Sequence, residues 1–145
     1  MAAGINILVN DGGAPARIMN LGNANAAIEA GMFVDINSSG KIIAATDDQE
    51  ASSSGEKVSL GVLLVDAVAG APTSIITGKG IVCNVQAAEA ITVGQELTTD
   101  DAGKVEPTAD ADAHRAVGIT LAASVTTATK ADGSAIPHMV KVLLL

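Results

Sequence analysis

Short runs of Val, Ile and Leu recur along the chain, and each run is bounded by Gly, Asp, Ser or Pro. Runs of this kind are typical of β-strands. Ile81, Cys83 and Val85 alternate with Val82 and Asn84, which predicts a strand with one buried face. Residues 62–65 and 143–145 lack this alternation, so we expect strands there that are buried on both faces or at an interface.

Two turn sequences predict β-hairpins. They are residues 37–40 (NSSG) and 100–103 (DDAG), and each ends in a glycine that can adopt the positive φ the turn needs. Helix propensity is confined to residues 24–30 and 86–90, each only one or two turns long. The flanking strands of the two hairpins are expected at residues 32–36 with 41–45, and at residues 95–99 with 104–107.

The chain also repeats itself. Residues 24–42 and 87–105 share six identities at an offset of 63 positions: Ala24/Ala87, Ala27/Ala90, Ile28/Ile91, Gly31/Gly94, Gly40/Gly103 and Lys41/Lys104. The same elements follow each copy, namely an acidic loop (46–57 and 106–115), an apolar run (60–67 and 117–124) and a closing β segment (75–85 and 136–145). This order predicts an internal duplication, with halves at about residues 24–85 and 87–145.

We therefore expect an all-β fold, a small β-sandwich or barrel of about eight strands from two related halves, with one or two very short helices. An extended N-terminal arm is expected over residues 1–23, and a β domain over residues 24–145. Gly, Asn, Ala and Pro dominate the arm, and only residues 5–9 predict a strand within it. A fully extended arm spans about 75 Å, at roughly 3.3 Å per residue, which is enough to reach a neighbouring subunit.

Composition excludes several classes of function. The 145 residues include one aromatic, Phe33, and a core without rings leaves a thin stability margin that favours assembly with other subunits. Eight Lys and Arg stand against sixteen Asp and Glu, for a net charge of −8, and no basic block occurs. Nucleic-acid binding needs cations for the phosphates and aromatics for stacking, so that class is excluded. An acidic surface also repels anionic lipid headgroups.

Targeting and redox features are equally sparse. The longest stretch without charge, residues 116–129, has 14 residues, whereas a membrane span needs about 18. Residues 1–10 have no basic region, so no secretory signal is expected. The single cysteine, Cys83, cannot form an internal disulfide, which fits either a reducing cytoplasmic origin or a fold that does not depend on redox conditions.

Candidate chemistry does not assemble into a site. Cys83 lies mid-strand and is expected to be buried and inert, while His114 and His138 are expected at the surface. The acidic residues lack the spacing of a calcium loop and are expected to be solvated: Asp47, Asp48, Glu50, Asp110 and Asp112. The Gly78-Lys79-Gly80 stretch lacks phosphate-loop spacing, so these glycines and Gly61 are expected in turns or close sheet packing. The residues thus favour a scaffold over a catalyst, with no catalytic residue, cofactor or metal.

The repeated motif resembles that of tailed-bacteriophage capsid decoration (cement) proteins. Its pattern is A-x-x-I-x-x-G-x-x-V/L, then G-K-I/V, an acidic gap and V-G-I/V-x-L-x-A. The clearest copy is residues 91–105 (ITVGQELTTDDAGKV) followed by residues 116–122 (AVGITLA). Residues 34–42 (VDINSSGKI) followed by residues 60–63 (LGVL) also resemble the lambda-type head decoration proteins. Together the matching stretches cover about residues 24–123.

The resemblance implies a structural virion protein, made in the bacterial host cytoplasm and placed on the outer surface of the capsid. Proteins of this kind assemble as homotrimers at three-fold or quasi-three-fold sites, bridge neighbouring major capsid protein subunits and stabilise the expanded head. Their N-terminal arm commonly adds to a capsid-protein sheet. In this sequence the β-capable part of the arm is Ile5, Asn6, Ile7, Leu8 and Val9. No nucleic acid or membrane is expected as a partner.

Two alternatives stay open at this point. A biotinyl- or lipoyl-type carrier domain also has two quasi-symmetric β halves, but it needs an attachment lysine in a Met-Lys-Met-like turn, and Lys41 and Lys104 lack such neighbours. A glycan-binding surface module usually stacks sugar rings on aromatic side chains, and only Phe33 is available. A hydrolase is disfavoured because the residues supply no catalytic constellation.

Overall fold

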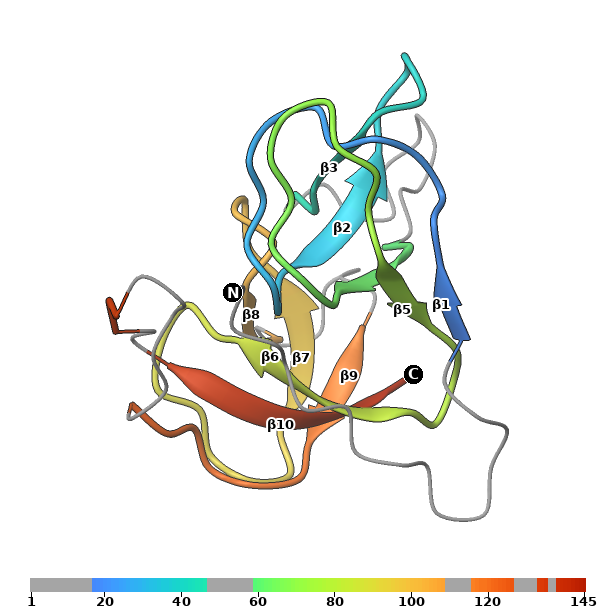
Figure 1. Cartoon of the computed structure of the whole chain (residues 1–145). Coiled ribbons are helices and arrows are strands. Elements are labelled where there is room, and N and C mark those ends of the chain that lie inside the picture. Colours follow the sequence, from blue (N-terminus) through green and yellow to red (C-terminus); the bar gives the residue numbers. More distant parts are fainter. Residues whose placement is uncertain (1–16, 47–58, 109–115, 127–132, 136–137) are drawn as a thin grey trace.

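Ten short β-strands form the described part of the chain in a computed structural model, which describes residues 17–46, 59–108, 116–126, 133–135 and 138–145 (Figure 1). The described residues contain no helix, and the fold is all-β, as predicted. The strands are β1 (Arg17–Met19), β2 (Phe33–Ile36), β3 (Ile42–Ala44), β4 (Gly61–Leu63), β5 (Ile75–Thr77), β6 (Val82–Gln86), β7 (Glu96–Thr99), β8 (Val105–Pro107), β9 (Gly118–Thr120) and β10 (Met139–Leu144).

The strands form two five-stranded antiparallel sheets with the same topology. The order is β1-β5-β4-β2-β3 in the first sheet and β6-β10-β9-β7-β8 in the second, so each strand of the first sheet has a counterpart five strands later. This arrangement matches the two related halves predicted from the sequence. β6 pairs with β10 in the second sheet, so the halves meet at the turn between β5 and β6 rather than near residue 86.

In each sheet, an isolated parallel β-bridge joins the segment after the first strand to the strand at the opposite edge, which closes the sheet toward a barrel. Ala24, which follows β1, pairs with Ile42 of β3, and Ala87, which follows β6, pairs in the same way with Val105 of β8. The expected short helices at residues 24–30 and 86–90 are therefore wrong. A helix of one or two turns is unstable alone, and these segments instead give their backbone groups to neighbouring chain, as when Asn25 N–H donates to Ile42 C=O at 2.8 Å.

Both predicted hairpins are present and share one turn design. The side-chain oxygen of Asn37 accepts the N–H groups of Ser39 at 2.9 Å and Lys41 at 3.0 Å. Asp100 does the same for residues 102 and 104, at 2.9 and 2.8 Å. An acceptor side chain at the first turn position thus fixes both turns, and β2–β3 and β7–β8 lie where they were expected.

The main core fills the space between the two sheets with branched aliphatic side chains. The first sheet contributes Phe33, Val62 and Ile76 to it, and the second sheet contributes most of the rest, including Cys83, Val85, Leu97, Val105, Val140, Val142 and Leu144. A second core covers the outer face of the first sheet, where Ala24, Ile28 and Ala67 pack on Val34, Ile42, Leu63 and Ile75. The central strands of the first sheet are consequently buried on both faces.

Strand patterning agrees with the predictions in two places and departs from them in a third. Ile81, Cys83 and Val85 are buried, and Val62 and Leu63 face the two different cores. Residues 143–145, in contrast, do not form a strand buried on both faces. β10 alternates between buried and half-buried positions, and Leu145 is exposed, so one face of this strand packs in the main core while the other face is only partly covered.

The N-terminal boundary differs from expectation in one respect. Residues 17–19, included in the expected arm over residues 1–23, form β1 and pair with β5 from Arg17↔Thr77 to Met19↔Ile75. Residues 1–16 lie outside the described part of the chain. The division into an arm and a β domain therefore remains a prediction.

Two equivalent glycines allow adjacent strands to approach. A Cβ on Gly61 would lie 2.1 Å from the Ile76 carbonyl oxygen, and a Cβ on Gly118 would lie 2.2 Å from Val142 Cγ1. Gly61 and Gly118 open β4 and β9, which occupy the same place in their sheets. Any side chain at either position would force neighbouring strands apart.

We predict that Gly61→Ala destabilises the fold by about 1–3 kcal/mol more than Gly70→Ala, because overpacking at Gly61 adds to the cost of a positive φ that both variants share. Both glycines have positive φ, at 148° and 81°, but no atom lies within 4 Å of a Cβ on Gly70. Urea unfolding of the two variants measures the difference. Equal losses of unfolding free energy would contradict the close-approach argument.

Burial of Cys83 generates a second prediction. Desolvation in the core raises the pKa of the Cys83 thiol from 9.0 to about 12. Below pH 9 the thiol is neutral in both states, and as pH rises from 9 toward 12 only the unfolded chain ionises, so stability is lost. Between about pH 8 and about pH 10.5 we expect the wild type to lose roughly 2 kcal/mol more unfolding free energy than Cys83→Ala. Parallel urea titrations at the two pH values test this, and identical pH dependence of the two proteins would contradict it.

Candidate functional site

The candidate nucleophile and histidines do not come together. Cys83 is fully buried in the core between the sheets, and His138 is half-buried just before β10. His114 lies outside the described residues. A thiol whose pKa is raised by burial is a poor nucleophile near neutral pH, so this position supports the expected packing role.

The described ranges contain neither a metal-binding cluster nor a membrane-spanning helix. Within them, no group of three or more His, Cys, Asp or Glu residues is placed to hold a metal ion. No helix there is long and apolar enough to cross a bilayer. The predicted acidic loop residues Asp47, Asp48, Glu50, Asp110 and Asp112 lie outside these ranges.

The Gly78-Lys79-Gly80 stretch forms the turn that carries the chain from the first sheet to the second. Both glycines have positive φ, at 129° and 76°, and Gly80 N–H donates to the Leu144 carbonyl at 2.8 Å. These glycines therefore serve a turn, as predicted, and no phosphate loop is formed. The turn also places Lys79 at the wall of a hollow between the two halves.

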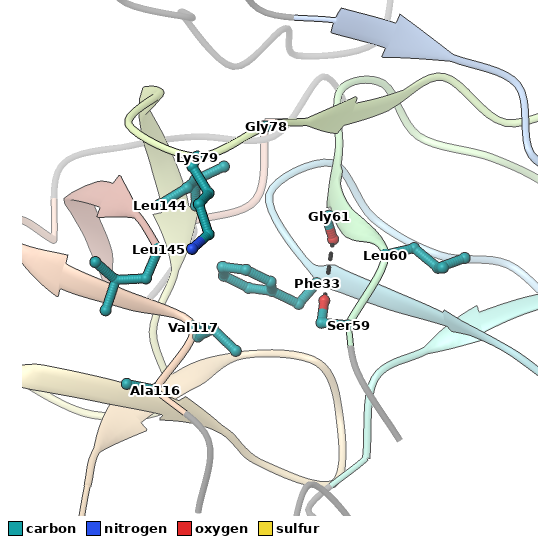
Figure 2. A pocket seen from close by; sticks show the side chains of 10 residues that line it. All are labelled: Phe33, Ser59, Leu60, Gly61, Gly78, Lys79, Ala116, Val117, Leu144 and Leu145. Carbon is teal, nitrogen blue, oxygen red and sulfur yellow. Dashed lines mark hydrogen bonds between the residues drawn. The ribbon is translucent and has the colours of Figure 1, made fainter. Parts of the chain in front are cut away.

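A hollow of about 560 Å³ lies beside this turn, and Figure 2 shows the Phe33 ring and the Lys79 amino group directed into it. The Ser59 hydroxyl at its wall donates to the Val34 carbonyl at 3.3 Å and contacts the Gly61 carbonyl at 3.5 Å. The ten lining residues are Phe33, Ser59, Leu60, Gly61, Gly78, Lys79, Ala116, Val117, Leu144 and Leu145.

The chemistry of this hollow is that of packing. Its ten lining residues include one amine and one hydroxyl but no His, Cys, Asp or Glu, so they offer no acid–base pair. An apolar side chain would fit the part of the wall that the described residues form. Sequence reasoning missed the hollow because it forms only where the two halves meet.

The junction between the halves is a further feature that the sequence did not reveal. The Gln86 amide nitrogen Nε2 donates to the Ala30 carbonyl at 2.9 Å and to Glu29 Oε2 at 3.1 Å. Backbone bonds accompany these contacts, from Gln86 N–H to Gly31 C=O at 2.9 Å and from Phe33 N–H to Gly103 C=O at 2.7 Å. Four hydrogen bonds thereby join one segment of each half beside Phe33 of the main core.

The first sheet ends in an exposed edge. All three residues of β1 are exposed, and the strand order places β1 at the rim of its sheet. The predicted partner-binding residues precede this strand, but Ile5, Asn6, Ile7, Leu8 and Val9 lie outside the described residues. Their backbone pairing with a partner remains a prediction.

The chain is similar to known proteins in both sequence and fold. The sequence model of the family described as "Phage cement protein" matches residues 14–135, which is most of the chain. No curated protein sequence matches it. Among solved structures, the chain is similar to the head fiber gp8.5 N base of bacteriophage phi29, with a TM-score of 0.62 over 90% of this chain and 94% of that one. Sequence identity to it is 17%, so this likeness concerns the fold. By the family match, the chain belongs to the phage cement proteins, a structural, non-enzymatic family of the phage capsid.

Proposed function

We propose that this protein binds the outer surface of a phage capsid at three-fold or quasi-three-fold sites as a homotrimer, and stabilises the expanded head by bridging major capsid protein subunits. The family match over residues 14–135 is the observation that carries the proposal. The aliphatic all-β body supports it, since the described residues offer packing surfaces and sheet edges in place of reactive groups. Membership of this family favours it over the carrier and glycan-binding alternatives.

The N-terminal arm supplies the contact with the capsid in this proposal. The arm leads directly into β1, the exposed rim of the first sheet. Residues 5–9 add a strand to an open sheet edge of the capsid protein, where main-chain hydrogen bonds give affinity and side chains give specificity. Ile5, Ile7 and Val9 share one face of that strand, and Asn6 and Leu8 share the other.

Three arms make a weak contact durable. Ordering a loose arm costs about 1–2 kcal/mol per residue, so a single arm binds weakly. A trimer presents the second and third arms at high effective concentration, which raises the overall affinity by about 10²–10⁴. The trimeric body therefore acts as the link that couples three capsid subunits.

We predict that deletion of residues 2–16 leaves the β body folded and its oligomeric state unchanged. Binding to undecorated heads is expected to fall by at least about 100-fold, because the avidity of the three arms is lost. The deletion stops at residue 16 because Arg17–Met19 pair with β5. Circular dichroism and sedimentation report the fold and size, and co-sedimentation with heads reports binding. Normal decoration by the truncated protein would contradict the role of the arm.

A point substitution separates backbone pairing from side-chain contact. Ile7→Pro removes one N–H and fixes φ, so we expect it to abolish most head binding, whereas Ile7→Thr retains strand propensity and the N–H and is expected to bind within about tenfold of the wild type. Binding isotherms on undecorated heads measure both. Equal affinity of the two variants would show that residues 5–9 do not bind as a strand.

A further inference from the structure

The contact between the two halves has two sides, and both are buried. One side is the docking segment, residues 29–33 of the first half, which accepts three hydrogen bonds from Gln86 and donates one through Phe33 N–H. On the receiving side, Gln86 and Gly103 of the second half meet it. Ala30 is 5% exposed and Gln86 is 2% exposed. A Cβ on Gly103 would lie 2.5 Å from the Phe33 carbonyl oxygen, so the two backbones touch there.

The repeat places an equivalent of each side elsewhere on the molecule. At the offset of 63 positions, residues 92–96 correspond to the docking segment, while Asn23 and Gly40 correspond to Gln86 and Gly103. These equivalents are exposed almost throughout, and Val93 is 64% exposed where Ala30 is 5% exposed. Among the described residues, one copy of the chain thus makes this contact once, and the equivalent pair of surfaces makes no such contact.

Both unused sides already have the required backbone shape. Thr108 N–H donates to Glu96 C=O at 2.9 Å, as Ala45 N–H donates to Phe33 C=O at 2.9 Å. Gly94 and Gly31 have φ values of 81° and 88°, and Gly40 and Gly103 have φ values of 74° and 75°. Little reorganisation would therefore accompany a second contact of the same kind, which lowers its cost.

We propose that residues 92–96 of one copy dock on Asn23 and Gly40 of a second copy, repeating between chains the contact that joins the two halves within a chain. This inference deepens the proposed homotrimer by naming its interface, and it rests on that function only for the number of copies. The contact is head-to-tail, so each copy uses both of its sides when the assembly closes into a ring. Three copies would place six related halves around that ring.

The chemistry of the two surfaces fits this partner. Asn23 retains a side-chain amide where Gln86 donates to a carbonyl, and Val93 offers a larger apolar surface than Ala30. No atom lies within 4 Å of a Cβ on Gly40, so the space that the Phe33 backbone occupies beside Gly103 is open beside Gly40. Glu96 stands in place of Phe33 and would approach Gly40 beside Lys41, so opposite charges meet. The contact between chains is thus more polar than the one within the chain.

Two substitutions test the two sides separately, each with a matched control. Gly40→Asn keeps a residue that tolerates positive φ, but its side chain fills the space on the receiving side. Val93→Asp places a charge in residues 92–96, the equivalent of the docking segment. The controls are Gly70→Asn, at another open glycine with positive φ, and Val68→Asp, at a valine that is 68% exposed. Sedimentation equilibrium of the full chain is expected to give three copies for the wild type and both controls, and one copy for both test variants.

A cross-link tests the pairing directly and detects even a weak contact. In a Cys83→Ala background, Asn23→Cys and Val93→Cys are combined in one chain and oxidised. We expect disulfide-linked species of up to three copies on a non-reducing gel. Mixing the two single-cysteine proteins is expected to give linked pairs that contain one of each. A monomeric wild type, trimeric Gly40→Asn or Val93→Asp variants, or cross-links no stronger than with Val68→Cys in place of Val93→Cys would overturn the interface.

Head binding separates this inference from the proposed function. Wild-type protein that decorates heads while both test variants keep its oligomeric state would refute the interface and leave the function standing. Wild-type protein that is trimeric through this contact but does not bind undecorated heads would refute the function and leave the interface standing.

Discussion

Burial of branched aliphatic side chains between the two sheets is the interaction on which the rest of the structure depends. Burying a Val, Ile or Leu side chain contributes roughly 1.5–3 kcal/mol, and with Phe33 as the chain's single aromatic residue such side chains make up most of the core. Small side chains fill the space only if the backbones come close together. Gly61 and Gly118 permit that approach within the sheets, and Gly103 permits it between the halves.

Much of the fold could be predicted because local pattern and local turn chemistry determine it. The alternation of Ile81, Cys83 and Val85 and the two Gly-terminated hairpins identified their strands, and the repeat at 63 positions anticipated the shared topology. The expected count of about eight strands fell short of the ten in the described residues because strands of three residues, such as β1, carry little periodic signal. The expected helices failed because tertiary pairing of Ala24 and Ala87 overrode local propensity.

The functional surfaces were less accessible to sequence reasoning. The hollow beside Phe33 and the Gln86 contact each combine residues from both halves, and no local pattern reports how two halves dock. The signal that could have located the junction is the repeat itself, since equivalent positions with different exposure mark where the symmetry is broken. Ala30 and Val93 form such a pair.

The position of β10 has a consequence for how the protein is made. β10 is the last strand along the chain, yet it lies between β6 and β9 in its sheet. The first sheet has all of its strands once residue 77 has left the ribosome, whereas the second must wait for residues 139–144. Translation that stops before residue 139 therefore yields a chain in which β6 has lost its neighbour, with an apolar sheet edge open to aggregation.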